Sequence, residues 1–441
     1  MDLPRSAPDA QGVDAAGIEA FVAAVAALDD AELHSLMVVR HGHVVAERWW
    51  EPYAAQTPHL LYSLSKSFTS TALAFAVAEG LVDLDATVLS YFPEFDARVT
   101  DARSRAIRVR HVAAMASGHD DETLDRARVA GDGDLVLGLL LLPPEREPGT
   151  FFAYNQPCTY ALSAIVQRVS GGSLTDFLRP RLFDPLGISG YGWRKDRLGR
   201  EIGYAGLYAP TEAIAKLGQL YLRNGEWDGR QLLSPEWVEE ATRAHVATVR
   251  PEPDWDQGYG FQFWRARHGY RGDGAFGQFM VVLPEADAVV AITSQSPDMQ
   301  GVLDALWSHL LPALTADGTS ALSRPVPGGP VGAIAPALLE PGPGNGVTAL
   351  LSVEVRPGEL VLTDKGPAVT VPLGAPEAWT TTGPVASAYA WADGRLLVDV
   401  VFVETPHRLR LSLDLTGERF EAQWQTEPLG GPKLAQLRRP D

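Results

Sequence analysis

The segment Ser63-Leu64-Ser65-Lys66 opens a run of residues with helical periodicity, and it constrains the fold of this chain more than any other feature. From Ser65 to Glu79 apolar residues recur at helical spacing, and Gly80 stands where a helix C-cap is expected. Residues three apart share one face of a helix. The Ser63 hydroxyl and the Lys66 amine are therefore predicted to lie side by side.

The chemistry of this pair depends on the protonation state of Lys66. A serine hydroxyl is a weak nucleophile until a neighbour takes its proton, and a lysine can do so only where burial or positive surroundings lower its pKa. Only five of the 37 basic residues are lysines, and because arginine cannot give up its proton, a lysine here points to chemistry. By chance alone, however, an S-x-x-K motif has odds of roughly one in four. Other motifs must therefore support it.

A second polar segment, Pro148–Pro157, precedes an amphipathic run from Tyr160 to Val169. The prolines and the glycine of the segment predict a turn, and the run predicts a helix. Tyr154 is thus expected on a loop at the entrance of a helix. Loops on a rigid scaffold are where catalytic groups tend to lie.

The order of these segments resembles the serine β-lactamase and penicillin-binding-protein superfamily. Within it the chain is similar to the class C-related branch, which includes esterases, D-amino-acid peptidases and nylon-oligomer hydrolases. Six segments carry the resemblance in the family's order: 38–53, 61–88, 107–120, 146–171, 206–234 and 272–294. The resemblance implies that Ser63 is the acyl-accepting nucleophile and Lys66 its proton-relay partner. It implies that Tyr154, as a phenolate or through Lys66, assists deprotonation and protonates the leaving group.

The family's Tyr-x-Asn motif is altered in this chain to Tyr154-Asn155-Gln156. Either amide is a candidate to orient Lys66 and to contact a substrate carbonyl. We favour Gln156, because it occupies the third position of the motif.

The family's Lys-Thr-Gly or His-Thr-Gly motif is absent, and residues 269–274 stand in its place. An oxyanion hole needs N–H groups and no particular side chain, so we expect the N–H groups of Ser63 and Gly272 to hold the oxyanion. Asp273 and Arg271 are further candidate substrate-binding residues. Arg271 or His268 would only partly replace the family's cation, which supports recognition of a β-lactam or D-alanyl carboxylate.

These residues predict a serine hydrolase that acts through a covalent acyl-enzyme on a small ester or amide, as carboxylesterases do. A D-amino-acid peptidase or weak β-lactamase is the closest alternative, and acyl transfer to an acceptor other than water uses the same residues. A catalytically inert ligand-binding or scaffold protein with the same fold is an alternative of another class. Five aromatic residues are candidates for an apolar pocket, or for the core: Trp49, Trp50, Phe152, Tyr259 and Trp264.

The composition of the chain limits the classes of molecule that it is expected to bind. A net charge of −18 speaks against nucleic acid and anionic membranes, and no apolar run reaches the 18 or so residues that a membrane span requires. The histidines lack metal-ligand spacing, and no cofactor motif occurs, so we expect neither a metal nor a cofactor. The single cysteine, Cys158, fits a chain that uses no disulfides. We expect a cytoplasmic protein with a small-molecule substrate. The sequence is compatible with a homo-oligomer and does not decide the oligomeric state.

The fold class implied is α/β (α+β): an antiparallel sheet flanked by helices, with an inserted helical subdomain, followed by a C-terminal all-β domain. We assign residues 1–100 and 236–322 to the sheet part and 101–235 to the helical subdomain. The Pro/Gly-rich stretch 323–346 is interpreted as a linker or as an extended segment that wraps over the hydrolase region. Residues 347–441 contain short β-patterned runs about ten residues apart, which predict a small sandwich or barrel.

Overall fold

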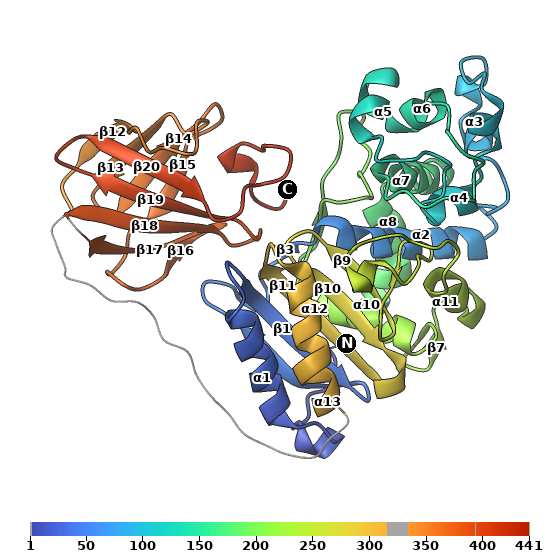
Figure 1. Cartoon of the computed structure of the whole chain (residues 1–441), viewed down its shortest axis with the longest axis horizontal. Coiled ribbons are helices and arrows are strands. Elements are labelled where there is room, and N and C mark those ends of the chain that lie inside the picture. Colours follow the sequence, from blue (N-terminus) through green and yellow to red (C-terminus); the bar gives the residue numbers. More distant parts are fainter. Residues whose placement is uncertain (1, 315–333, 393, 441) are drawn as a thin grey trace.

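An antiparallel sheet with helices on both faces forms the first part of the protein (Figure 1). The computed structural model describes residues 2–314, 334–392 and 394–440. The sheet has six strands in the order β2-β1-β11-β10-β9-β8. Their bounds are β1 Glu32–Arg40, β2 His43–Trp49, β8 Trp264–Arg265, β9 Tyr270–Gly274, β10 Gln278–Leu283 and β11 Ala288–Gln295.

The helices of this part come from three stretches of the chain, one before the sheet, one within it and one after it. They are α1 (Ala15–Ala26), α2 (Ser65–Ala78), α3 (Ala102–Ala106), α4 (Val109–Ala113), α5 (Leu124–Ala130), α6 (Leu135–Leu141), α7 (Gln156–Ser170), α8 (Leu174–Leu178), α9 (Asp184–Leu186), α10 (Thr211–Leu222), α11 (Pro235–Thr242), α12 (Met299–Ala305) and α13 (Leu311–Ala313). Two small sheets join β3 (His59–Leu60), β5 (Leu207–Ala209) and β4 (Gly192–Trp193), and β6 (Glu226–Trp227) and β7 (Arg230–Gln231).

Both faces of the central sheet are buried, because side chains alternate along each strand and each face meets helices. In β10, Phe279 and Val281 belong to the core shared with α1 and α12. Met280 and Val282 point the other way, into the core shared with α2 and α10. The predicted antiparallel sheet flanked by helices is confirmed.

The predicted site is carried by two helices, α2 and α7, that pack on each other. Helix α2 begins at Ser65, as the periodicity predicts, and a single turn of 3-10 helix, η2 (Tyr62–Leu64), leads into it. Helix α7 begins at Gln156, four residues before the predicted start. Its second residue is Pro157, which the first turn of a helix tolerates because the N–H there has no intrahelical acceptor. The earlier start places the polar segment at the tip of the helix.

A nine-stranded sheet forms the C-terminal part, in the order β15-β14-β13-β12-β20-β19-β18-β17-β16. The strands are β12 Ala337–Pro341, β13 Ser352–Arg356, β14 Glu359–Thr363, β15 Val369–Pro372, β16 Thr380–Thr382, β17 Val385–Ala392, β18 Arg395–Phe402, β19 Arg408–Asp414 and β20 Arg419–Trp424. The sheet curls until β15 contacts β16 and β17 at its other end, so that it nearly closes around one apolar core. The predicted all-β C-terminal part is confirmed.

The division into domains stays a proposal. Of the stretch that we interpreted as a linker, residues 323–333 lie outside the described residues, as do 315–322 of the expected sheet part. Strand β12, inside the same stretch, pairs with β13 and β20. Helix α10, inside the expected helical subdomain, packs on β10 and β11 of the central sheet.

The C-terminal sheet docks on the first part of the protein beside η2. The N–H of Leu60, in β3, donates to the carbonyl of Glu404 at 2.8 Å. Arg408, at the start of β19, forms an ion pair of 2.7 Å with Glu32, at the start of β1. The interface therefore touches the strand and the turn that lead directly to Ser63.

Candidate active site

Ser63 and Lys66 meet as the helical spacing predicts. Lys66 Nζ lies 3.0 Å from Ser63 Oγ, 2.6 Å from Gln156 Oε1 and 2.8 Å from the carbonyl oxygen of Tyr204. An amide oxygen and a carbonyl oxygen can only accept hydrogen bonds, so Lys66 must donate to both. In a neutral amine the position that remains is the lone pair, and it faces the hydroxyl of Ser63.

Burial makes the neutral form of Lys66 accessible. The side chain is 2% exposed, and its burial lowers the lysine pKa from 10.5 to about 7. The negative charges of Glu122 and Asp273 act against this and raise the pKa. At neutral pH a large share of Lys66 therefore carries no proton and can accept one from Ser63.

Tyr154 lies on the loop before α7 with its ring beside the lysine. Lys66 Nζ is 4.8 Å from the centre of the ring, which stacks on Trp264 at 5.4 Å. Burial raises the pKa of the Tyr154 phenol well above its usual range, the charge of Asp273 raises it further, and a hydrogen bond with Ser63 partly offsets both. Tyr154 thus remains a neutral phenol at neutral pH. This favours Lys66 as the base and Tyr154 as a proton donor over a phenolate base.

The two neighbouring amides have different environments. Gln156, the first residue of α7, accepts from Lys66 through Oε1, and its own N–H donates to the carboxylate of Glu122 at 3.1 Å. Asn155 is fully buried, and its Oδ1 accepts from the N–H and the hydroxyl of Thr123 at 3.0 and 2.9 Å. Gln156 therefore contacts the amine, whereas Asn155 ties the loop to the start of α5.

Glu122 is a site residue that sequence reasoning missed. Three consecutive acidic residues in a loop, 120–122, carry no motif that would single out one of them. The structure brings Glu122 to the tip of α7, where its charge acts on Lys66.

The cation of the strand that replaces Lys-Thr-Gly is buried and does not line the cleft. Arg271 in β9 is fully buried, where it binds Asp273 at 3.1 Å and donates to the carbonyl of Asp254 at 2.7 Å. Asp273, one strand period further on, lines the cleft together with Ala275. The ring of His268 lies tilted against the ring of Trp307, with centroids 5.0 Å apart, and His268 is not among the residues that line the cleft. The cleft therefore has a carboxylate where the family pattern has a cation.

Gly272 points to the opposite face of β9. A Cβ atom at this position would meet Ser67 Oγ at 2.4 Å and Leu64 Cδ1 at 2.6 Å, so the glycine permits close packing of β9 on η2 and α2. Gly272 does not line the cleft, whereas Ala275 does. This geometry does not favour Gly272 as the second oxyanion donor, and the N–H of Ala275 is the better candidate.

The cleft around Ser63 has a volume of about 440 Å³. Its walls combine apolar surface with three carboxylates and one guanidinium. They are formed by Ser63, Tyr154, Arg250, Glu252, Trp255, Trp264, Asp273, Ala275, Pro297, Asp298, Met299 and Gln300. Of the five aromatic residues considered for a pocket, only Trp264 lines this cleft. Residues 250–255 and 297–300 carry no sequence motif, and only the tertiary fold brings them here.

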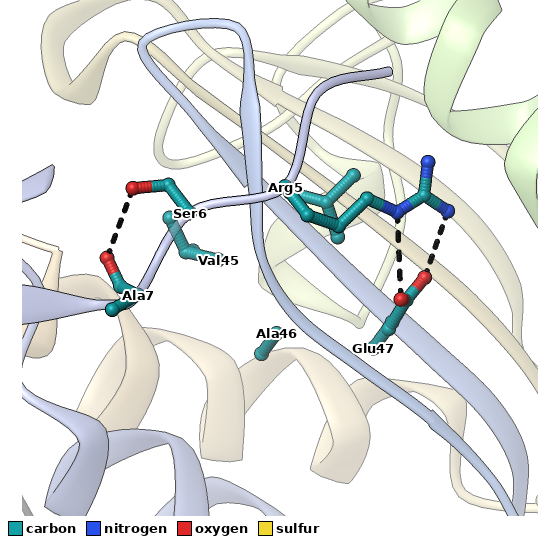
Figure 2. A pocket seen from close by; sticks show the side chains of 7 residues that line it. Arg5, Ser6, Ala7, Val45, Ala46 and Glu47 are labelled. Atoms are coloured by element: carbon teal, nitrogen blue, oxygen red, sulfur yellow. Dashed lines mark hydrogen bonds and ion pairs between the residues drawn. The ribbon is translucent and has the colours of Figure 1, made fainter. Parts of the chain in front are cut away.

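A second hollow, of about 380 Å³, lies between the N-terminal segment and β2 (Figure 2). Its one cation, Arg5, donates to Glu47 at 2.9 Å and to Glu212 at 3.2 Å, so the guanidinium is already paired. No nucleophile with a base lines this hollow, so the cleft at Ser63 is the better candidate active site of the two.

Within residues 2–314, 334–392 and 394–440 no three His, Cys, Asp or Glu side chains are grouped so that they could hold a metal ion. No helix in these same ranges is both long enough and apolar enough to span a bilayer.

A model of the Beta-lactamase family matches residues 21–313, about two thirds of the chain. The chain belongs to this family. Among curated proteins, the 6-aminohexanoate-dimer hydrolase of Paenarthrobacter ureafaciens is 27% identical over 297 residues, which cover 62% of this chain and 74% of that protein. The lovastatin esterase of Penicillium rubens is 30% identical over 163 residues, 32% of this chain and 41% of that protein.

The fold of this Beta-lactamase family member also matches solved structures. The octameric penicillin-binding protein homologue from Pyrococcus abyssi superposes with a TM-score of 0.51 at 17% identity. The match covers 89% of this chain and 96% of that one. Since residues 2–314 make up less than three quarters of the chain, the shared fold extends into the C-terminal sheet.

Proposed function

We propose that this serine hydrolase cleaves a small ester or amide through a covalent acyl-enzyme on Ser63. One observation carries the proposal: Lys66 Nζ has two neighbours that can only accept hydrogen bonds, and its remaining position faces Ser63 Oγ at 3.0 Å. With a pKa of about 7, this amine can take the serine proton. The hydrolase and esterase relatives support the same class of reaction.

The steps follow from the geometry. Ser63 Oγ attacks the substrate carbonyl carbon while its proton passes to Lys66 Nζ, and the N–H groups of Ser63 and Ala275 stabilise the negative oxygen that forms. Tyr154 donates its proton to the departing oxygen or nitrogen and recovers one from Lys66. Water then attacks the acyl-enzyme by the reverse proton path and releases the acid.

The charges of the cleft favour substrates without a carboxylate near the scissile bond. Asp273 occupies the strand that carries a cation in the family pattern, and Arg271, which pairs with it at 3.1 Å, does not line the cleft. Glu252 and Asp298 add two further carboxylates, against the single guanidinium of Arg250. Like charges in a desolvated site repel. We therefore favour a carboxylesterase over a D-amino-acid peptidase or weak β-lactamase, either of which would rely on Arg250 alone.

The test compares a neutral and an anionic ester, p-nitrophenyl butyrate and p-nitrophenyl hemisuccinate, together with benzylpenicillin. Wild type should turn over the neutral ester at least tenfold faster than the anionic one, and intact-mass spectrometry should show a butyryl adduct and little penicillin adduct. Ser63→Ala should show neither adduct nor turnover. A stable penicillin adduct would move the assignment to a D-alanyl-recognising enzyme, and a wild type without adduct or turnover would favour an inert scaffold.

The role of Asp273 is tested by Asp273→Asn. We expect this change to reduce the preference for the neutral ester. The rates are measured at about pH 8.5, where Lys66 is neutral in both wild type and Asp273→Asn. Asp304→Asn is the matched control, because Asp304 pairs with Arg267 and does not line the cleft. An unchanged preference in Asp273→Asn would contradict the charge argument.

Two expectations about the protein's context stay predictions. A homo-oligomer is compatible with the octameric state named for the Pyrococcus abyssi homologue, and light scattering on the purified protein tests it. A cytoplasmic location is tested by cell fractionation.

A further inference from the structure

Tyr62, the residue directly before the nucleophile, has an unusual backbone conformation. Its φ is 47°, in the left-handed region that residues other than glycine, asparagine and aspartate seldom adopt. Such a conformation persists only where surrounding contacts hold it. Because Tyr62 is covalently joined to Ser63, whatever holds Tyr62 also sets the direction of the Ser63 side chain.

The contact that holds Tyr62 comes from the C-terminal sheet. The Tyr62 hydroxyl lies 2.6 Å from His407 Nε2, across 345 residues of sequence. The opposite nitrogen, Nδ1, lies 3.0 Å from the carbonyl oxygen of Thr426, which can only accept. Nδ1 therefore carries the hydrogen, Nε2 is the acceptor, and the Tyr62 hydroxyl donates to it.

His407 is itself held rigidly. The residue is fully buried, and its backbone N–H donates to Thr405 Oγ1 at 3.2 Å. Burial lowers the pKa of its imidazole to about 4, so the ring stays neutral and Nε2 remains an acceptor at neutral pH. A neutral, fixed acceptor suits a positioning role.

The rings of Tyr62 and His407 also contact Phe276, the neighbour of the second candidate oxyanion donor, Ala275. Phe276, which follows Ala275 in the turn between β9 and β10, lies edge-on to the Tyr62 ring at 5.3 Å and to the His407 ring at 5.5 Å. Phe276 also has a positive φ, of 66°. The three rings thus join the residue before Ser63, the residue after Ala275 and the C-terminal sheet.

We propose that His407 is a positioning residue through which the C-terminal β domain holds Ser63 and Ala275 in reactive geometry. The inference rests on the proposed function, in which Ser63 is the nucleophile. It assigns the C-terminal domain a part in acylation in addition to covering the first part of the protein. The domain acts through Tyr62 and Phe276 and does not touch the reacting atoms.

The test measures acylation directly, as the rate of fluorophosphonate labelling and as kcat and KM for p-nitrophenyl butyrate. Tyr62→Phe and His407→Leu each remove one partner of the hydrogen bond, from opposite sides of the interface. Both should lower the labelling rate and kcat about tenfold or more, with KM within about twofold, because a small misplacement of a nucleophile strongly slows its reaction. His407→Gln keeps an acceptor and should recover part of the loss, and the double variant should be no slower than the slower single one.

Glu32→Gln is the matched control. It weakens the ion pair of 2.7 Å with Arg408 at the same interface and leaves Tyr62 untouched, so labelling should stay at the wild-type rate. Thermal unfolding of every variant shows that each is folded. The inference is overturned if Tyr62→Phe keeps wild-type kcat, or if Glu32→Gln slows labelling as much as His407→Leu does. A wild type that is not labelled at all would instead overturn the proposed function, and this inference with it.

Discussion

The pH dependence of acylation should report the titration of Lys66. Burial lowers the pKa of this lysine from 10.5 to about 7, a difference of roughly 3.5 units, or about 5 kcal/mol between its two protonation states. An unperturbed lysine would be neutral in only about one molecule in 3,000 at pH 7, whereas Lys66 is neutral in about half. Since only the neutral amine can accept the Ser63 proton, kcat/KM should rise about tenfold from pH 6 to pH 8 and then level off.

The perturbation that tests the cause of this profile is Glu122→Gln. The charge of Glu122 raises the pKa of Lys66, so its removal should shift the rise in kcat/KM to lower pH. Glutamine keeps an oxygen that can accept from the N–H of Gln156, as Glu122 does at 3.1 Å. Glu145→Gln is the matched control, because Glu145 caps the same loop at the N–H of Asp120 and should leave the profile in place.

The assay follows release of nitrophenol from p-nitrophenyl butyrate at its isosbestic wavelength, so that the signal does not depend on pH. A profile that is flat between about pH 5.5 and 8.5 would refute Lys66 as the base. A profile that rises only above about pH 9 would instead refute the lowered pKa of Lys66. A shift to higher pH in Glu122→Gln would refute the electrostatic reasoning.

Three further predictions concern stability. Lys66→Met should raise the free energy of unfolding by about 2 kcal/mol. The change removes a penalty of about 5 kcal/mol for burying the amine, and it loses three hydrogen bonds that each stabilise the fold by about 1 kcal/mol. Between about pH 7 and 10.5 the Lys66 amine is protonated in the unfolded chain and neutral in the folded one, so wild-type stability should rise with pH in that window. The Lys66→Met variant should lose this rise, and a lower melting temperature in the variant would contradict the prediction. Gly272→Ala should cost about 1–3 kcal/mol, because its Cβ would meet Ser67 Oγ at 2.4 Å, and an unchanged denaturation midpoint would show that the strand can shift instead. His34 and His59 form a buried pair at 3.0 Å whose pKa values are lowered by burial, that of His59 to about 3. Both bind protons more readily when unfolded, so the contribution of this pair to stability should be fully present above about pH 6.5 and should fall by about 1.4 kcal/mol per pH unit for each histidine below about pH 6. In acid-dependent thermal unfolding, His59→Phe should reduce the slope by the share of one histidine, about 1.4 kcal/mol per pH unit.

Local geometry explains why part of the candidate site was predictable. The contact between Ser63 and Lys66 requires only one helical turn, and α2 begins where the periodicity predicts. Tyr154 was identified through the order of motifs and the helix that follows it. The spacing of the C-terminal strands likewise depends on near neighbours in the sequence, so the all-β part was predicted correctly. The sheet with flanking helices was implied by the resemblance to the family, and it is confirmed.

The choice between the two amides shows where sequence reasoning ends. Asn155 and Gln156 differ by one position, and what separates them is which way the chain turns as it enters α7. Their partners, Thr123 and Lys66, come from other segments of the chain. The inward turn of Arg271 likewise depends on Asp254, on a loop outside its own strand.

The amino-acid sequence by itself predicted that Ser63 and Lys66 lie side by side, because this follows from spacing along one helix, and it predicted the all-β C-terminal part from the spacing of its strands. The candidate roles of these residues and of Tyr154, and the sheet with flanking helices, were implied by the order of motifs that resembles the family. Only the tertiary structure decided the pKa of Lys66, the carboxylate at Asp273 in the cleft wall and the contact of His407 with Tyr62. The physical reason is that burial and electrostatic environment are set by residues distant in the sequence. No local pattern encodes which of them the folded chain brings together.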